Sequence, residues 1–159
     1  MDAPEVALER YLHRRIPLSA ALGVRVAAAG PERVRLTAPL AQNVNHSGTV
    51  FGGSATAVAT LAGWSLLHLR LAAAQISART VIQRSRMEYR RPIPADFEVE
   101  CRLTDPGAWE RFVAVLARRG RARLRLDAEL SCAREPVGRF EGEFVALGSA
   151  LGAADPTDP

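Results

Sequence analysis

The sequence of 159 residues contains no lysine, so all 21 of its basic side chains are arginines. The net charge is +4 and the isoelectric point is about 10. Such a charge favours nucleic acids or anionic ligands. However, the arginines alternate with apolar residues, and aromatic residues make up only 6% of the chain, too few to form a stacking surface with them. We therefore attribute the arginines to a GC-rich genome and expect no nucleic-acid partner.

Cysteine is also scarce, with only Cys101 and Cys132, which lie far apart and outside any CxxC pair. No paired histidines stand near them, so the spacing of a zinc site is missing. Each cysteine falls on the apolar phase of a strand pattern, as expected for buried free thiols in a reducing cytosol. The N-terminus is charged and has no apolar core, which argues against a signal peptide. We expect a cytoplasmic protein without a metal site.

Full charges are missing from Ser47 to Leu69, a stretch long enough to cross a bilayer. The stretch contains four glycines together with serines, threonines and His68, and the chain has no second stretch of this kind. A helix buried in a soluble core explains this composition better than a membrane span.

Hydrophobic spacing predicts two helices, at 4–15 and 53–73, the second being apolar on nearly all sides. A period of two predicts strands at about 23–29, 33–38, 78–89, 97–103, 109–117, 121–132 and 139–147. A curved antiparallel sheet wrapped around the long central helix would bury the apolar surfaces of both. We expect one α+β domain over residues 1–147, with 1–15 as an N-terminal helix and 148–159 as a flexible tail.

The paired glycines Gly52 and Gly53 stand where the long apolar helix begins. The first amide N–H groups of a helix have no partner within it, and the helix dipole is positive there. This geometry suits an anion or the oxygen of a polarised carbonyl. Alternatively, the glycines only let the loop enter a crowded core, with Ser54 or Thr49 as the helix cap. The residues alone leave both interpretations open.

Residues 45–64, NHSGTVFGGSATAVATLAGW, resemble the loop-and-helix signature of hotdog-fold thioesterases. The phenylacetate-type branch has N-x-x-G-x-x-H-G-G followed by an acidic residue two turns into the helix, and this chain matches at Asn45, Gly48, Gly52 and Gly53. MEYRRP at 87–92 resembles the Y-x-R-P strand end of the same superfamily. The most similar subgroup is the YiiD C-terminal type, a thioesterase domain fused behind an acetyltransferase in some bacteria. The resemblance, which covers about residues 10–147, implies a hotdog fold and a homodimer or dimer of dimers with its site between two subunits.

Two residues depart from the phenylacetate-type pattern. Phe51 stands in place of the histidine, and Thr60 stands in place of the aspartate that serves as base or nucleophile. A threonine can hold a water molecule by hydrogen bonds but does not readily take its proton at neutral pH. The acid–base chemistry of that branch therefore does not carry over.

Catalytic roles can nevertheless be assigned to four residues as hypotheses, of which the role of Asn45 is the one that the matched motif implies. The amide of Gly53 would polarise the thioester carbonyl, Thr60 would position water from one helical turn further in, and Asn45 would orient the acyl group or the water. His46 is the only nearby side chain of a type suited to base chemistry. The expected substrate-binding residues are Phe51, Gly52, Ser54, Trp64, Arg84 and Arg86.

Several of these residues have a simpler explanation. Ser54 without a base beside it is a helix-start hydroxyl. Trp64 fits either an acyl tunnel or the core. Arg84 and Arg86 fit either the nucleotide end of coenzyme A or a solvated strand face. His46 fits an exposed loop.

The function implied by the resemblance is hydrolysis of an acyl-CoA or acyl-carrier-protein thioester, with no cofactor apart from the coenzyme A of the substrate. The main alternative is a non-catalytic acyl-CoA-binding hotdog protein that acts as a sensor or subunit, since the helix has no carboxylate. A hydratase or dehydratase ranks third, because it would need a histidine with an acidic partner.

Overall fold

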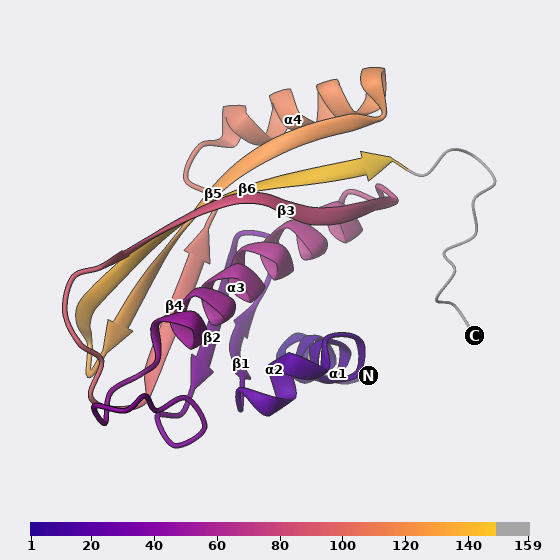
Figure 1. Ribbon diagram of the computed structural model, residues 1–159. Coiled ribbons are helices and arrows are strands. Elements are labelled where there is room, and N and C mark those ends of the chain that lie inside the picture. Colours follow the sequence, from indigo (N-terminus) through magenta and orange to yellow (C-terminus); the bar gives the residue numbers. More distant parts are fainter. Residues whose placement is uncertain (149–159) are drawn as a thin grey trace.

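The computed structural model describes residues 1–148 (Figure 1). Residues 149–159 of the expected tail lie outside the described residues, whereas Gly148 ends the last strand. Along the chain the elements are α1 (Pro4–Arg15), α2 (Pro17–Ala21), β1 (Arg25–Ala29), β2 (Arg33–Ala38), α3 (Gly52–Ala73), β3 (Ala78–Tyr89), β4 (Phe97–Arg102), α4 (Pro106–Arg119), β5 (Arg121–Cys132) and β6 (Glu135–Gly148).

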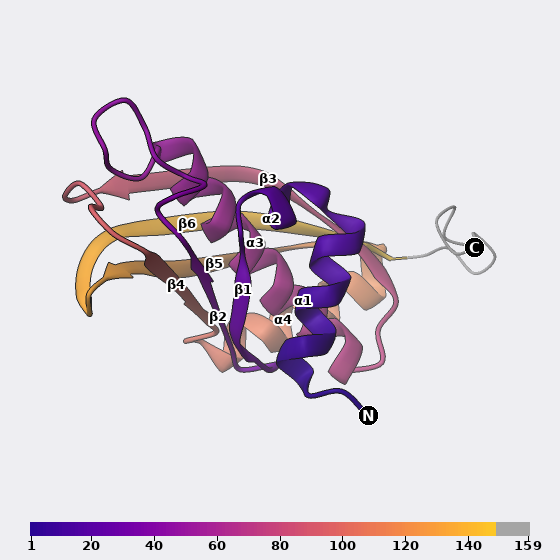
Figure 2. The ribbon, with the colours of Figure 1, turned by 90° about the horizontal axis from the view of Figure 1, so that it is seen from below.

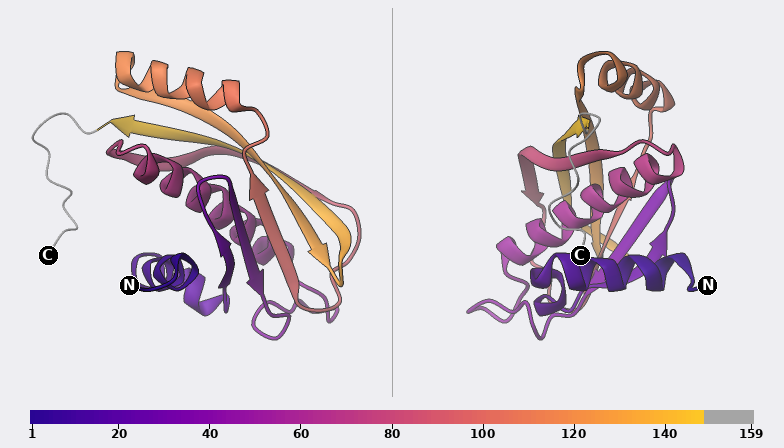
Figure 3. Two further views of the ribbon diagram at one scale, coloured as in Figure 1. Left: turned by 180° about the vertical axis from the view of Figure 1, so that it is seen from behind. Right: turned by 90° about the vertical axis from the view of Figure 1, so that its right-hand side faces the viewer.

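The six strands form one antiparallel sheet in the order β1-β2-β4-β5-β6-β3. The sheet curves around α3, which lies along its concave side (Figures 1 and 3). Alternate residues of β5, from Ala122 to Cys132, are buried against the interior, and their neighbours face outward. Both cysteines are buried and free. The curved sheet around a long helix confirms the predicted hotdog architecture.

The segment 109–117, which was predicted to be a strand, is instead part of the helix α4, so the prediction was wrong. The Asp105 side chain accepts a hydrogen bond from the Gly107 amide at 2.9 Å, and Pro106 occupies the first turn. Gly120 ends the helix with a φ of 67°. The buried Phe112 and Leu116 are four residues apart, a helical spacing that the alternation obscured.

The two edges of the sheet differ in what covers them. Helix α1 lies alongside β1 (Figure 2). Glu9 of α1 accepts a hydrogen bond from the Val26 amide at 2.9 Å, and His13 lies 2.8 Å from the Val24 carbonyl oxygen. Along β3, the opposite edge, nine of the 12 residues are exposed in the single chain and the other three are half-buried. Helix α1 thus blocks further strand pairing at one edge, while no described residue pairs with the outer side of the other edge.

The uncharged stretch of the sequence lies mainly in α3, which is enclosed by the sheet. Within residues 1–148, no helix is long and apolar enough to cross a membrane. The short helix α2, which the sequence analysis missed, turns the chain between α1 and β1 and leaves Leu18 exposed beside α3.

Candidate functional site

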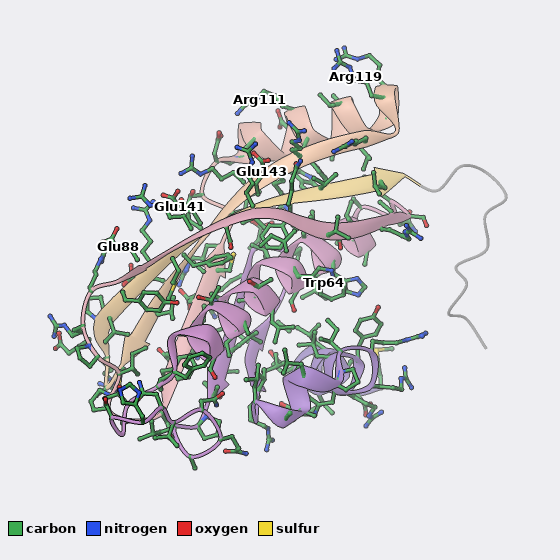
Figure 4. The ribbon with its side chains drawn as sticks, viewed as in Figure 1. Trp64, Glu88, Arg111, Arg119, Glu141 and Glu143 are labelled. Carbon is green, nitrogen blue, oxygen red and sulfur yellow. The ribbon has the colours of Figure 1, made fainter. Side chains whose placement is uncertain are left out.

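One face of α3 escapes full burial. Gly52, Thr56, Thr60, Trp64 and His68 follow one another at intervals of four, and each is half-buried, while most other residues of the helix are buried. A spacing of four places residues on one side of a helix. This row of five residues, called here the α3 row, runs beside the open strand β3. Figure 4 shows Trp64 on the side of α3 that faces α1.

The α3 row begins at a group of unused hydrogen-bond donors. The amides of Gly52, Gly53 and Ser54 have no acceptor among the described residues, and no side chain caps the helix. Gly53 is exposed. Because these N–H groups are at the positive end of a 22-residue helix, they can bind an anion or a polarised oxygen.

Close packing also explains the two glycines. A Cβ on Gly52 would lie 3.1 Å from the hydroxyl oxygen of Tyr89, and a Cβ on Gly53 would collide with the ring of Phe51. The Phe51 ring is itself 58% exposed at the entrance of the helix. The two interpretations of the glycine pair are therefore compatible, since Gly53 is exposed despite its tight contact with Phe51.

Tyr89 and Thr56 form a hydroxyl pair that the sequence analysis did not include in the site. Tyr89 donates a hydrogen bond to the Gly52 carbonyl oxygen at 2.8 Å, and its oxygen lies 2.7 Å from Thr56 Oγ1. Since the Tyr89 hydrogen is engaged, Thr56 is the donor of the second bond. The remaining lone pairs on the pair's oxygens are hydrogen-bond acceptors. The signal for Tyr89 was its place in MEYRRP, and the signal for Thr56 was its spacing of four from Gly52.

Thr60 lies further from the helix start than predicted. It is seven residues beyond Gly53, which corresponds to about 10 Å along the helix axis and to two turns instead of one. Its hydroxyl donates to the Thr56 carbonyl oxygen at 2.9 Å. The expectation that Thr60 acts one turn in is thus corrected: Thr56, about 4.5 Å along the axis from Gly53, occupies that level.

The Asn45 side chain shapes the loop that leads into α3. Its amide nitrogen lies 3.0 Å from Thr49 Oγ1 and 3.4 Å from the Val50 carbonyl oxygen. Its side-chain oxygen accepts from the backbone amides of Ser47 and Thr49. All four hydrogen-bonding positions are occupied within the loop, whereas contact of Asn45 with substrate remains a prediction. His46 is exposed in the same loop.

Asn43, which the sequence analysis did not single out, holds this loop to the core. It is 2% exposed and donates to the carbonyl oxygens of Leu22 and Pro39, at 2.8 Å each. Its own carbonyl oxygen accepts from the Phe51 amide at 2.7 Å. Asn43 therefore sets the position of the residue just before the free amides.

An apolar cavity of about 270 Å³ lies over the middle of the α3 row. Its lining comes from the α1–α2 junction, α3, β3 and β6, and consists of Ile16, Leu18, Ala57, Thr60, Leu61, Trp64, Ile82 and Phe144. None of these side chains is charged. The indole N–H of Trp64 donates to the Thr80 carbonyl oxygen at 3.2 Å, and its ring stacks on His68 with centroids 4.9 Å apart. Trp64 thus belongs to both the cavity and the core.

Arg84 and Arg86 lie on the outer face of the sheet. They pair in register with Glu143 and Glu141, whereas the buried Phe144 and Phe140 alternate with these residues on β6. Glu141 and Glu143 point away from α3 (Figure 4). The two arginines therefore do not line the cavity, and binding of a nucleotide by them remains a prediction. Ser54 is buried at the helix start, where no described residue forms a hydrogen bond with its hydroxyl.

The sequence matches a known protein family, and the fold matches several solved structures. Residues 5–148 match the family described as "Putative thioesterase (yiiD_Cterm)". A protein of unknown function from Chlorobaculum tepidum TLS has a TM-score of 0.85 at 25% identity, over 91% of this chain and 94% of that one. A Shewanella oneidensis protein described as a putative thioesterase has a TM-score of 0.80 at 26% identity, over 92% and 99%. A Pseudomonas aeruginosa protein described as a probable thioesterase has a TM-score of 0.81 at 25% identity, over 94% and 99%.

The family match spans nearly all of the described residues, and the structural matches share the curved sheet around a long helix. The chain therefore belongs to the hotdog-fold thioesterase family of the YiiD C-terminal type.

Proposed function

We propose that this protein hydrolyses acyl-CoA or acyl-carrier-protein thioesters, and that the amides of Gly52 and Gly53 hold the carbonyl oxygen. The observation that carries the proposal is a set of N–H groups at the start of α3 that have no acceptor among the described residues, with Gly53 exposed, beside an apolar cavity. Fixed donors aimed at a developing oxyanion stabilise the transition state of acyl transfer. The water oxygen attacks the carbonyl carbon and the C–S bond breaks; one proton of the water goes to the leaving sulfur and the other to solvent, so the products are a carboxylate and a thiol.

The attacking water fits at the Tyr89–Thr56 pair. The free lone pairs there accept the hydrogens of a water molecule, one turn beyond the Gly52 and Gly53 amides. Neither hydroxyl is a base at neutral pH. Without a base, the rate follows the hydroxide concentration, and kcat/KM rises about tenfold per pH unit. If kcat/KM instead reaches a plateau as the pH rises, and this plateau disappears in His46→Gln, then His46 is the base that accepts the proton of the attacking water.

A second copy of the chain would complete the site. The open strand β3 exposes Val81, Ile82 and Tyr89, and α1 leaves that edge free. We infer that two β3 strands pair antiparallel across a two-fold axis, in a homodimer or a dimer of dimers. Pairing there would cover the α3 row with residues of the partner. Arg84 and Arg86, near the seam, are proposed to contact the phosphates of the substrate.

The proposal is tested by following thiol release from a panel of acyl-CoAs and acyl-carrier proteins. Thr56→Val keeps the shape of the side chain and removes the hydroxyl, and Tyr89→Phe does the same for the ring. Each is expected to lower kcat by about 10- to 100-fold with little change in KM. Thr37→Val, on β2, is the matched control and should retain full activity. Unchanged kcat in both site variants would overturn the role of the pair.

A second candidate is an acyl-CoA-binding protein without turnover. It is favoured by the absence of any carboxylate along α3, within residues 52–73. Calorimetry with acyl-CoA distinguishes the two candidates. Binding of the thioester with no thiol release from any substrate would establish the binding protein and rule out the hydrolase.

A further inference from the structure

The apolar cavity ends at Trp64. Among the residues of α3, its lining extends from Ala57 to Trp64, and His68, the next member of the α3 row, is not part of it. A chain that starts at the Gly53 amide and follows the row passes Thr60 before it meets the indole. Trp64 lies 11 residues beyond Gly53, about 16 Å along the helix axis.

The indole is held in place on two sides. Its N–H is bonded to the Thr80 carbonyl oxygen, and its ring lies 4.9 Å from His68 at an interplanar angle of 12°. His68 in turn stacks on Tyr11 of α1 at 5.0 Å. These contacts leave the tryptophan little freedom to swing aside, so a ligand that is too long meets a rigid wall.

The chemistry of the lining selects the ligand. Seven of the eight lining side chains are hydrophobic, and the eighth, Thr60, has its hydrogen bonded within the helix. A charged or strongly polar acyl group would lose its hydration without gaining partners. A straight apolar chain fits, because each methylene gains from burial. With C–C bonds of ~1.5 Å, or about 1.3 Å along an extended chain, 16 Å accommodates about a dozen carbons.

We propose that Trp64 determines acyl-chain specificity, and that the cavity selects straight, uncharged acyl chains of about eight to twelve carbons. This inference rests on the proposed thioesterase function, because it places the thioester carbonyl at the Gly53 amide. Wild-type kcat/KM should therefore rise with chain length to about ten carbons and fall at least tenfold beyond about fourteen.

Trp64→Ala should move the preferred chain length upward by about four carbons, because it opens the cavity toward His68. Trp64→Phe keeps an aromatic wall and should give a smaller shift, which preserves the test if the alanine variant does not fold. Leu69→Ala, which shortens a partly buried side chain outside the cavity, is the matched control and should leave the preference unchanged. An unaltered chain-length profile in Trp64→Ala or Trp64→Phe would overturn the inference even if hydrolysis were observed.

A binding measurement separates this inference from the hydrolase proposal. The chain has two tryptophans, and Trp109 lies in α4 under the guanidinium of Arg70. In Trp109→Phe, therefore, all tryptophan fluorescence reports on Trp64. Titration with non-hydrolysable alkyl thioethers of coenzyme A should change this fluorescence, with affinity rising about fourfold per methylene up to about ten carbons and then levelling.

Such chain-length-dependent binding without turnover of the corresponding thioesters would support the acyl site while rejecting the hydrolase. No fluorescence change with any thioether would overturn the acyl site, because a chain seated in the cavity would contact the Trp64 ring.

Discussion

At the scale of single residues, protonation of His68 in the α3 row should lower the free energy of unfolding in acid. Burial lowers the pKa of His68 below its ordinary value of 6.5. The unfolded chain therefore binds the proton more readily than the folded one. The contribution of neutral His68 to the free energy of unfolding is complete above pH 6.5, and it is lost as the pH falls from 6.5 through the lower pKa of the folded state. We expect the urea midpoint to drop between about pH 7.5 and about pH 5. His68→Phe should flatten this decline and His46→Gln should not; equal pH slopes in wild type and His68→Phe would contradict the assignment.

The glycine pair offers a second test at this scale. In Gly53→Ala the new methyl group meets the ring of Phe51, an exposed side chain that can move away. Because alanine favours the helix, the free energy of unfolding should stay level or rise by about 0.5 kcal/mol. The displaced ring and the methyl group crowd the amides, so kcat should fall about 100-fold. The double variant Phe51→Ala/Gly53→Ala should recover part of the activity, whereas full activity in Gly53→Ala would separate this amide from catalysis.

At the scale of the elements, α4 is a stabilising addition beside the sheet. Strand β4 pairs only with residues 127–132 of β5, and α4 lies beside the remaining half (Figure 1). Phe112 is 3% exposed on this helix. Phe112→Ala should lower the free energy of unfolding by about 3 kcal/mol, measured by urea denaturation. Activity measured well below the denaturation midpoint should be unchanged, because the cavity lining includes no residue of α4. Loss of kcat in this folded variant would show that α4 supports the site.

At the scale of the whole molecule, the open strand β3 predicts both assembly and a salt dependence. Sedimentation should give twice the 17.2 kDa of one chain, or four times that mass for a dimer of dimers. Antiparallel pairing of two β3 strands about their centre would gather Arg84 and Arg86 of both copies on the outer face. Their repulsion should weaken as salt increases, so the dimer should become tighter between about 0.05 M and about 0.5 M salt.

The double variant Arg84→Gln/Arg86→Gln should abolish this salt dependence. Arg14→Gln, on α1, is the matched control because it removes an exposed charge far along the chain from β3. If the protein is a monomer at micromolar concentration, the proposed site between two subunits is wrong. If the dimer dissociates more readily as salt increases, its interface is not the pair of β3 strands.

The sequence by itself determined the central helix and most of the sheet. The apolar run after Gly53 had no polar side to face solvent, and strands such as 121–132 had one buried and one exposed face; only a sheet around the helix satisfies both. The free amides at Gly52 and Gly53 also followed from the sequence, because they are a property of any helix start. The helix at 106–119 was missed because its apolar residues fit both periods, and its caps were interpreted as turns.

The tertiary structure alone decided which side chains meet at the site. Tyr89 is 33 residues from Thr56, and no local pattern pairs them. The orientation of the β3 arginines was also decided by the tertiary structure. Ile82 and Arg84 are two residues apart and would share a face in a regular strand. A β-bulge between them instead places Ile82 in the cavity and Arg84 on the outer face. The position of this bulge depends on how β3 pairs with β6. The pairing with β6, and not the residue spacing within β3, determines which face of the sheet the residues after the bulge occupy.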